Sequence, residues 1–282
     1  MYLSLNGEVV EQKEATISVF EHGFMYGLGA FETFRIYKGH PFLLDDHFQR
    51  LRGSLLELGI EWNESKEYIV QHVNDLLQAN ELEDAYVRWN VSAGVGPLGL
   101  QTESYHSPTT IVYMKELPQE APITKKVRIL QTKRNTPEGQ HRLKSHHYLN
   151  NILGKRELGN DIHMEGLFLT EKGHIAEGVV SNVFWVKDDV LYTPDIDTGI
   201  LNGVTRQFVI ELAKKENVFV KEGFFHENEL KEADEVFITN SIQEIVPIIS
   251  VDDTFFSDSS LATKLQALYS QYTTKLWSKK EL

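Results

Sequence analysis

Short runs of alternating hydrophobic and polar residues fill the first part of the chain, and stretches with apolar residues at helical spacing separate them. The alternation in LSLNGEVV predicts a hairpin, and that in FETFRIYKGHPFL predicts two strands joined at Lys38 and Gly39. HFQRLRGSLLELGI has the spacing of an amphipathic helix. A second helix over about 66–79 and the strand YVRWNVSAG follow. This pattern predicts a domain that mixes strands and helices.

The second part of the chain has the same mixture, after a stretch that contains two prolines. VRILQTKRN and GLFLTEKGHIAEGVVSNVFWVKDDVLYTP alternate like antiparallel strands, TRQFVIELAKKE has the spacing of a helix, and ADEVFITNS precedes a last apolar strand. Pro118 and Pro122 mark the best linker candidate, because proline restricts its neighbours and ends regular structure. We therefore predict an α+β fold of two domains, residues 1–117 and 123–282, joined by a linker at 118–122.

Composition and charge agree with a globular protein and exclude several functional classes. The 282 residues are 41% hydrophobic and 24% charged, which is enough chain for two packed domains. The absence of cysteine excludes disulfides, thiol catalysis and cysteine-ligated metal sites. A net charge of −13 disfavours broad attraction to nucleic acid or anionic membranes. Since the sequence shows no signal segment and no apolar run of about 18 residues, we expect a soluble, cytoplasmic protein.

Two segments carry residues that together suggest covalent cofactor chemistry. Lys144 lies in RLKSHHYLNN, just before a helical pattern, and Glu177, Ser181 and Asn182 lie in AEGVVSNVFW. A lysine that forms a Schiff base and a carboxylate that pairs with a pyridinium nitrogen are what a pyridoxal phosphate enzyme needs. Taken singly, each residue has a simpler interpretation: a lysine before a helix is usually a solvated surface residue, and a glutamate after a strand is more often part of a turn or cap.

Small polar residues at two predicted turns supply a candidate phosphate site. NGVTRQ places Val204 and Thr205 at an apparent helix start, and TNSIQE places Asn240 and Ser241 at a turn. Free backbone N–H groups and the helix dipole favour an anion at such positions. Arg50 would complete the cup, although its spacing from an aspartate one helical turn earlier also fits an ordinary ion pair. The same segments could equally be ordinary caps and turns.

Six segments together resemble a known enzyme family. They are YGLGAFETFR, DDHFQRL, RLKSHHYLNN, TEKGHIAEGVVSNVFW, GILNGVTRQ and TNSIQEIVP. In this order and spacing they are similar to the fold-type IV pyridoxal phosphate enzymes, the class-IV aminotransferase family, which include D-amino acid transaminases, branched-chain aminotransferases and aminodeoxychorismate lyases. The resemblance implies a two-domain α+β fold like that of D-amino acid transaminase, with pyridoxal 5'-phosphate in the interdomain cleft.

The resemblance also implies roles for individual residues. Lys144 would hold the cofactor and act as acid and base, and Glu177 would pair with the pyridine nitrogen. The groups that would hold the phosphate are Arg50, Thr205 and the backbone around Val204, Asn240 and Ser241. The groups that would orient the ring are Ser181 and Asn182, and those that would line the substrate side are Phe31 and Thr33.

Within the family, FEHGFMYGLGAFETFRIYKGHPFLLDDH and RNTPEGQHRLKSHHYLNN are most similar to bacillary 4-amino-4-deoxychorismate lyases. That resemblance implies β-elimination of pyruvate from 4-amino-4-deoxychorismate, giving 4-aminobenzoate for folate biosynthesis, by a homodimer. A branched-chain or D-amino acid transaminase is the alternative, and a non-catalytic protein that kept the fold is a third hypothesis. Against D-amino acid transamination, Ala93 and Val95 stand where those transaminases carry an arginine and a histidine for the substrate carboxylate.

Other motifs are set aside. Gly27 and Gly29 lack the third glycine and the following helix of a dinucleotide fingerprint. His146 and His147 are adjacent and cannot point the same way on a helix, and no spaced carboxylate completes a metal site, so we predict no metal. The arginines that could bind a substrate carboxylate by charge alone are Arg35, Arg88 and Arg142.

Overall fold

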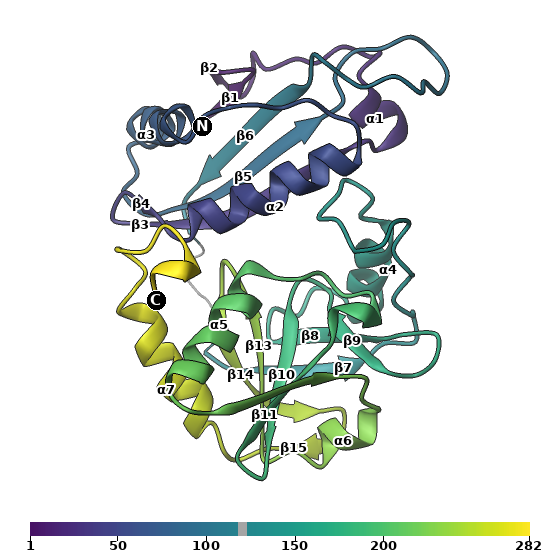
Figure 1. The fold of residues 1–282 in the computed structure, drawn as a ribbon, viewed down its shortest axis with the longest axis vertical. Helices are drawn as coiled ribbons and strands as arrows, with labels where there is room; N and C mark the ends of the chain where they lie inside the picture. Colours follow the sequence, from purple (N-terminus) through teal and green to yellow (C-terminus); the bar gives the residue numbers. More distant parts are fainter. Residues whose placement is uncertain (118–122) are drawn as a thin grey trace. The chain divides into compact units, whose positions relative to one another are not determined.

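A computed structural model describes residues 1–117 and 123–282 of the chain (Figure 1). The predicted linker, 118–122, lies outside the described residues, so the predicted domain boundary stays a prediction. The contacts between residues divide the chain into two compact units.

Each unit is assembled from separate stretches of sequence. The first unit comprises the described part of Met1–Pro118, together with Leu143–His147 and Thr273–Glu281. The second unit comprises the described part of Gln119–Arg142, together with Tyr148–Tyr272 and Leu282. The chain therefore returns to the first unit twice, and Lys144 lies in the first of these returns.

An antiparallel sheet forms the centre of the first unit. Its strands are β1 (Tyr2–Leu5), β2 (Glu8–Glu11), β3 (Gly29–Tyr37), β4 (His40–Pro41), β5 (Ala85–Ser92) and β6 (Thr109–Lys115), in the spatial order β2-β1-β6-β5-β3-β4. The two predicted hairpins are confirmed. Asn6 and Gly7 join β1 to β2, and Lys38 and Gly39 join β3 to β4; all four residues have positive φ, which the tightest hairpin turns require.

Two helices, α2 (Leu44–Glu57) and α3 (Lys66–Asn80), cover one face of this sheet. The unit also contains α1 (His22–Tyr26) and, near the end of the chain, a short 3₁₀ helix, η2 (Lys279–Glu281). Figure 1 shows α2 running along the sheet. Apolar side chains of α2 and α3, such as Phe48 and Val73, pack in one core with Phe34 and Trp89 from the strands. Each such buried side chain contributes about 1.5–3 kcal/mol through the hydrophobic effect.

The opposite face of the same sheet carries polar and aromatic residues. Side chains alternate between the two faces of a strand, and residues paired across neighbouring strands share a face. The residues that therefore lie opposite the core, on what we call the polar face, are Phe31, Thr33 and Arg35 of β3 with Tyr86, Arg88 and Asn90 of β5.

A mixed sheet of nine strands forms the second unit. The strands are β7 (Lys125–Ile129), β8 (Met164–Leu169), β9 (Ile175–Gly178), β10 (Asn182–Lys187), β11 (Val190–Pro194), β12 (Phe219–Gly223), β13 (Glu235–Asn240), β14 (Glu244–Val251) and β15 (Thr254–Phe255). The order is β12-β11-β10-β13-β14-β7-β8-β9, and β15 pairs with β14. The pairs β11–β12, β14–β7 and β7–β8 are parallel, and the others are antiparallel.

The helices of the second unit complete the predicted mixture. They are α4 (Leu149–Leu158), α5 (Val204–Lys215), α6 (Glu227–Lys231) and α7 (Ser260–Ser270), with the 3₁₀ helix η1 (Ile196–Thr198). The helix predicted from TRQFVIELAKKE is α5, and the predicted α+β class is confirmed in both units. Among the described residues, no helix is both long enough and apolar enough to span a bilayer.

Candidate active site

Backbone pairing to the edge of β3 holds Lys144 in the first unit. The N–H of Phe31 donates to the carbonyl oxygen of Lys144 at 2.9 Å, and the N–H of His146 donates to that of Gly29 at 3.0 Å. Ala30 and Ser145 form the bridge between these bonds. The Lys144 segment therefore behaves like a short added strand, and the sheet fixes where its side chain begins.

Two cationic groups contact the Phe31 ring on the polar face. Nζ of Lys144 lies 4.4 Å from the ring centroid, and the guanidinium carbon of Arg88 lies 3.7 Å from it. Nε of Arg88 also donates to Oδ1 of Asn90 at 3.0 Å. Such contacts stabilise a cation against an aromatic face, more so where water is excluded. Phe31 therefore lies beside Lys144, and Thr33 lies on the same face, paired across the strands with Arg88.

Arg50 bonds to Glu32 and not to Asp46, the aspartate one helical turn before it. Its Nε donates to Oε1 of Glu32 and its Nη2 donates to Oε2, both at 2.7 Å. Nδ1 of His47 lies 2.7 Å from the same Oε2. Asp46 instead accepts hydrogen bonds from the N–H and Nζ of Lys279. The guanidinium of Arg50 is thus held in one orientation by a bidentate pair, the geometry that gives arginine its specificity.

Burial and charge act in opposite directions on Glu32. Burial alone would raise the pKa of its carboxyl, but the Arg50 guanidinium and the His47 ring lower the pKa from 4.5 to about 2. Burial lowers the pKa of His47, and this effect exceeds the opposite pull of Glu32. At neutral pH the cluster is therefore a carboxylate, a guanidinium and a neutral imidazole.

His146 is a second neutral imidazole close to Lys144. Its ring stacks on Phe31 with 6.2 Å between centroids. Burial, followed by the positive charge of Arg88, lowers the pKa of His146 from 6.5 to about 4. A Cβ on Gly29 would lie 2.6 Å from this imidazole, so the glycine is needed for close approach of the ring. This contact gives Gly29 a local structural role.

In the second unit, Glu177 on β9 bonds to a guanidinium and to a backbone N–H. Its Oε1 accepts from Nε of Arg134 at 2.8 Å and lies 2.7 Å from the Nη2 of the same residue. Its Oε2 accepts from the N–H of Leu201 at 2.9 Å. Nε of Arg142 lies 3.6 Å from Oε1. Glu177 is 4% exposed, so these positive groups stabilise a carboxylate that water hardly reaches.

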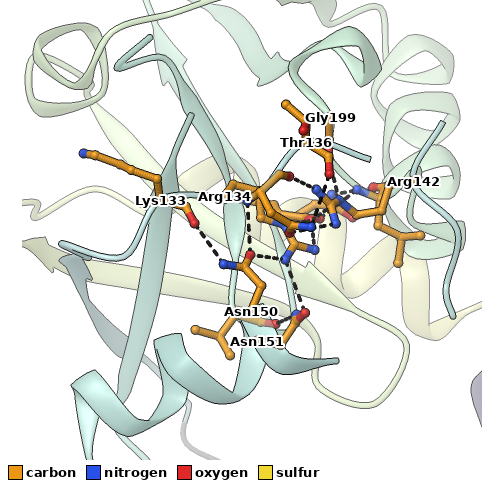
Figure 2. Close-up of polar contacts among 12 residues, drawn as sticks. Lys133, Arg134, Thr136, Arg142, Asn150, Asn151 and Gly199 are labelled. Carbon is orange, nitrogen blue, oxygen red and sulfur yellow. Dashed lines mark hydrogen bonds and ion pairs between the residues drawn. The ribbon is translucent and has the colours of Figure 1, made fainter. Parts of the chain in front are cut away.

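The first turn of α4 fixes Arg134 from its other side, as Figure 2 shows. Nη1 of Arg134 donates to Oδ1 of Asn150 at 2.6 Å and to Oδ1 of Asn151 at 3.2 Å. Nδ2 of Asn150 donates in turn to the carbonyl oxygen of Lys133 at 2.9 Å, and Nδ2 of Asn151 donates to that of Val179. Arg134 is therefore aimed at Glu177 by a network that α4 organises.

Arg142 lies next to this network in Figure 2 but is bound mainly by backbone oxygens. It donates to the carbonyl oxygens of Gly199 and Asn135. Burial, followed by the neighbouring charge of Arg134, lowers the pKa of Arg142 from 12.5 to about 10, against the opposite effect of Glu177. The group stays charged at neutral pH, and its donors hold two loops together.

Leu201 connects Glu177 to the start of α5. Its N–H donates to Glu177, and its carbonyl oxygen accepts from Nδ2 of Asn182 at 2.9 Å. Asn182 approaches α5 so closely that a Cβ on Gly203 would lie 2.1 Å from its Oδ1. The hydroxyl of Ser181 is buried and has no hydrogen-bond partner among the described residues. The predicted ring-orienting residues therefore lie close to Glu177. The Ser181 hydroxyl can still donate a hydrogen bond to a ligand.

The predicted phosphate groups of the second unit converge at the start of α5. The helix begins at Val204, and its N-cap residue, Gly203, has no side chain to cap it. Oγ1 of Thr205 lies 3.2 Å from Oγ of Ser241. The side chain of Asn240 accepts hydrogen bonds from the next turn, at the N–H groups of residues 242 and 243. An uncapped helix start beside two hydroxyls suits an anion.

The structure brings the predicted residues together in two groups. The first unit holds Phe31, Thr33, Arg50 and Lys144, and the second holds Glu177, Ser181, Asn182, Val204, Thr205, Asn240 and Ser241. Sequence reasoning missed Glu32 and Arg134, which orient Arg50 and Glu177. A signal existed for Glu32, because it is a charge at a core-facing position of an apolar strand. No local pattern marked Arg134.

Among the described residues, no group of at least three histidine, aspartate or glutamate side chains could hold a metal ion. The donor groups at the site are instead amine, guanidinium, hydroxyl and backbone N–H, with carboxylates neutralised by arginine. Such a set suits an organic anion.

Comparison with known proteins identifies the family of the chain. The family model described as amino-transferase class IV matches residues 29–251. The chain is 48% identical over 270 residues to an aminodeoxychorismate lyase from Bacillus subtilis (strain 168), covering 94% of this chain and 92% of that protein.

Solved structures share the whole fold. The branched-chain aminotransferase from Thermoproteus uzoniensis with norvaline has a TM-score of 0.88 and 26% identity, with 97% of this chain and 95% of that chain covered. The branched-chain amino acid aminotransferase from T.th. with pyridoxamine 5'-phosphate has a TM-score of 0.85 and 28% identity, with 97% and 94% covered. On the extent of these matches, this chain belongs to the class IV aminotransferase family.

Proposed function

We propose that this protein is a pyridoxal phosphate-dependent lyase that converts 4-amino-4-deoxychorismate into 4-aminobenzoate and pyruvate for folate biosynthesis. The 48% identity to the Bacillus subtilis aminodeoxychorismate lyase, over almost the full length of both chains, carries this choice of reaction. The two products together contain all the atoms of the substrate. The reaction therefore needs no second substrate, which separates it from transamination.

Each unit offers groups that fit a part of the proposed cofactor. Lys144 supplies an amine for covalent attachment, and Oε2 of Glu177 accepts one hydrogen bond and keeps a lone pair for a pyridine N–H. The uncapped start of α5 and the hydroxyls of Thr205 and Ser241 suit a phosphate. In the first unit, Glu32 orients Arg50 through Nε and Nη2, and the guanidinium charge of Arg50 suits a phosphate. When bound, pyridoxal phosphate withdraws electrons from the carbon that bears the substrate amine and makes its proton acidic.

We assign the proton transfers to the amine of Lys144. It removes the proton at C4 of the substrate, and it or a water that it orients delivers a proton to the methylene carbon of the departing enolpyruvyl group. The neighbouring imidazoles of His47 and His146 have lowered pKa values and stay neutral, so neither competes as a cation at neutral pH. Glu177, oriented by its hydrogen bond from Arg134, would pair with the pyridine nitrogen.

Ser181, Asn182, Phe31 and Thr33 complete the proposed site. Ser181 has a buried hydroxyl without a partner among the described residues, which suits a hydrogen bond to the ring substituents. Asn182 acts on the ring indirectly, since its amide holds Leu201. Phe31 and Thr33 would line the substrate side on the polar face. Val204, Asn240 and Ser241 would offer backbone N–H groups to the phosphate.

A homodimer working in the cytoplasm is part of the proposal. In the first unit, the apolar residues Val19, Phe20, Phe24, Val95, Leu98 and Leu100 are exposed. We call them the apolar cluster. The N–H of Gly96 donates to the carbonyl oxygen of Phe20, and Nε2 of His22 lies 2.9 Å from the carbonyl oxygen of Pro97. These bonds connect the segment around residues 19–24 to the segment around residues 95–100. Exposed apolar groups of this kind mark interaction surfaces, and a second copy of the chain is the proposed partner.

Branched-chain transamination is the alternative, because aminotransferases of that kind share the fold at a TM-score of 0.88. The deciding assay supplies 4-amino-4-deoxychorismate without any keto acid and follows 4-aminobenzoate and pyruvate together. Equal amounts of both products over many turnovers would support the lyase. Activity only when an amino donor and a keto acid are both present would assign the protein to the transaminases.

A further inference from the structure

The second unit buries a lysine and a glutamate that the proposed reaction does not use. Lys125 begins β7 and Glu165 lies on the neighbouring β8, and they are 6% and 4% exposed. Nζ of Lys125 lies 4.0 Å from Oε2 of Glu165. Charged residues are rarely so buried, because removing them from water costs free energy that only good partners offset.

Glu165 binds the turn that follows Glu177. Its Oε1 accepts from the N–H of Val179 at 2.8 Å, and the N–H of Val180 also bonds to this carboxylate. A Cβ on Gly178 would lie 3.2 Å from the same oxygen, so the turn is closely packed on Glu165. In the sequence, Glu177 precedes the two bonded residues, and the predicted ring-orienting residues Ser181 and Asn182 follow them.

Lys125 binds the turn that follows β13. Its Nζ donates to Oε1 of Gln243 at 3.0 Å, and Nδ2 of Asn240 donates to that same oxygen at 3.3 Å. Asn240 also accepts from the N–H of Gln243 at 2.8 Å. Lys125 thus closes the turn that carries Ser241, whose hydroxyl meets Thr205 of α5.

Net stability is a poor explanation for this pair. Burial raises the pKa of Glu165 and lowers that of Lys125, so both charged forms are disfavoured by their surroundings. At 4.0 Å the two groups also lack a direct hydrogen bond. Buried pairs of this kind often contribute nothing to stability and are kept where they specify one arrangement.

We propose that Lys125 and Glu165 are positioning residues that set the turn after Glu177 and the turn after β13 in register, and so shape the phosphate and ring ends of one cofactor site. This inference rests on the proposed function. Lys125 acts through Gln243 and Asn240, and Glu165 acts through the backbone of Val179. Neither residue touches the cofactor.

The test compares Lys125→Met, Glu165→Gln and the double variant. Apo-protein is titrated with pyridoxal 5'-phosphate, bound cofactor is followed by its absorbance, and the melting temperature of each apo-protein is measured separately. Each single change should raise the cofactor dissociation constant about tenfold, the lower end of what losing an outer partner costs at metal sites. The double variant has no unpaired buried charge, so its melting temperature should recover towards wild type while its dissociation constant stays raised.

Glu235→Gln is the matched control. Glu235 is also a buried carboxylate with a raised pKa, and it accepts from the backbone N–H groups of Leu261 and Ala262. It begins β13, whereas Asn240 ends that strand. The control should lower the apo melting temperature but leave the cofactor dissociation constant within about twofold of wild type, because it acts on α7.

The proposal is overturned if the single variants behave like the control, or if the double variant binds the cofactor as wild type does. Should a single variant fail to fold, the double variant decides by itself. A failure of the proposed function looks different, since wild-type protein would then show no saturable cofactor absorbance at all.

Discussion

Each unit buries one carboxylate against an arginine, and the two pairs act on different groups. Glu32 fixes the guanidinium of Arg50 through two hydrogen bonds, so the arginine is oriented before any anion arrives. At Glu177 the arginine is the supporting group, because Arg134 stabilises the carboxylate that would meet the cofactor ring. Preorganised charges of this kind cost no reorganisation when a ligand binds.

Replacing Glu32 with glutamine should destabilise the protein in a pH-dependent way. The folded pKa of about 2 lies below the usual 4.5, so ionisation favours the folded state above about pH 4.5, and this contribution is lost as pH falls towards 2. The shift corresponds to about 3 kcal/mol of unfolding free energy at neutral pH. Denaturant unfolding of wild type and Glu32→Gln is measured from pH 3 to 8. The difference between their free energies of unfolding should become smaller as the pH falls.

Asp45→Asn is the control for this experiment. Asp45 pairs with Lys66 at the surface, where such pairs contribute about 0–1 kcal/mol. If the difference in unfolding free energy between wild type and Glu32→Gln stayed constant over the whole pH range, the assigned role of the Glu32 charge would be contradicted.

Lys144→Ala should abolish covalent cofactor binding and reduce turnover by about 10²- to 10⁴-fold or more, because it removes both the attachment point and the proposed acid and base. Its backbone bond to Phe31 remains, so the fold should survive. Absorbance of the loaded protein and product formation are measured together. The exposed Lys172→Ala should leave both unchanged, and retention of wild-type turnover in Lys144→Ala would rule out the catalytic assignment.

At the scale of elements, the start of α5 connects the two ends of the second-unit site. The N–H of Leu201 bonds to Glu177, and its carbonyl oxygen bonds to Asn182. The chain then enters the helix whose first turn would hold the phosphate. The distance from Glu177 to the α5 N-terminus is thereby set by hydrogen bonds between these two side chains and the Leu201 backbone. A cofactor with a ring and a phosphate at fixed separation is suited to such a frame.

Gly203→Ala should weaken cofactor binding through packing alone. The φ of Gly203 is −61°, which any residue adopts, but the new Cβ would lie 2.1 Å from Oδ1 of Asn182. Relief of this overlap requires Asn182 or α5 to shift, at about 1–3 kcal/mol. A calorimetric titration with pyridoxal 5'-phosphate should show a raised dissociation constant.

Gly53→Ala is the matched substitution in α2, where a Cβ would meet nothing within 4 Å. It should leave cofactor binding unchanged and stabilise the protein slightly, since alanine favours a helix over glycine by up to about 1 kcal/mol. If Gly203→Ala bound the cofactor as tightly as Gly53→Ala does, the close approach of Asn182 to Gly203 would not contribute to cofactor binding.

The elements were predictable from sequence because their signals are local. The hairpins at Asn6 and Lys38, and the helix α5, follow from turn residues and from spacing. Local spacing suggested the wrong partner for Arg50, since Glu32 lies 18 positions away and only the packing of α2 on β3 brings the two together. Lys125 and Gln243 are 118 positions apart, and no pattern within a window of sequence can connect them.

At the scale of the whole molecule, turn-like segments grouped the candidate phosphate residues of the second unit in advance, and family resemblance added Glu177 to the same cofactor site. Val204 and Ser241 come from different parts of the chain, and no periodicity relates them. Both segments were predicted to offer free N–H groups to an anion, and the structure adds the contact between the hydroxyls of Thr205 and Ser241.

The apolar cluster makes the proposed homodimer testable by a single charge. Leu100 is 89% exposed within it, and burying an aspartate there against a second copy would cost several kcal/mol. Wild type should elute with light scattering at about twice the 32.4 kDa chain mass, and Leu100→Asp should shift towards that of one chain. Leu56→Asp is the control, because Leu56 is also exposed but lies on α2. A monomeric wild type would exclude the homodimer, and a dimer that survives Leu100→Asp would move the interface away from the apolar cluster.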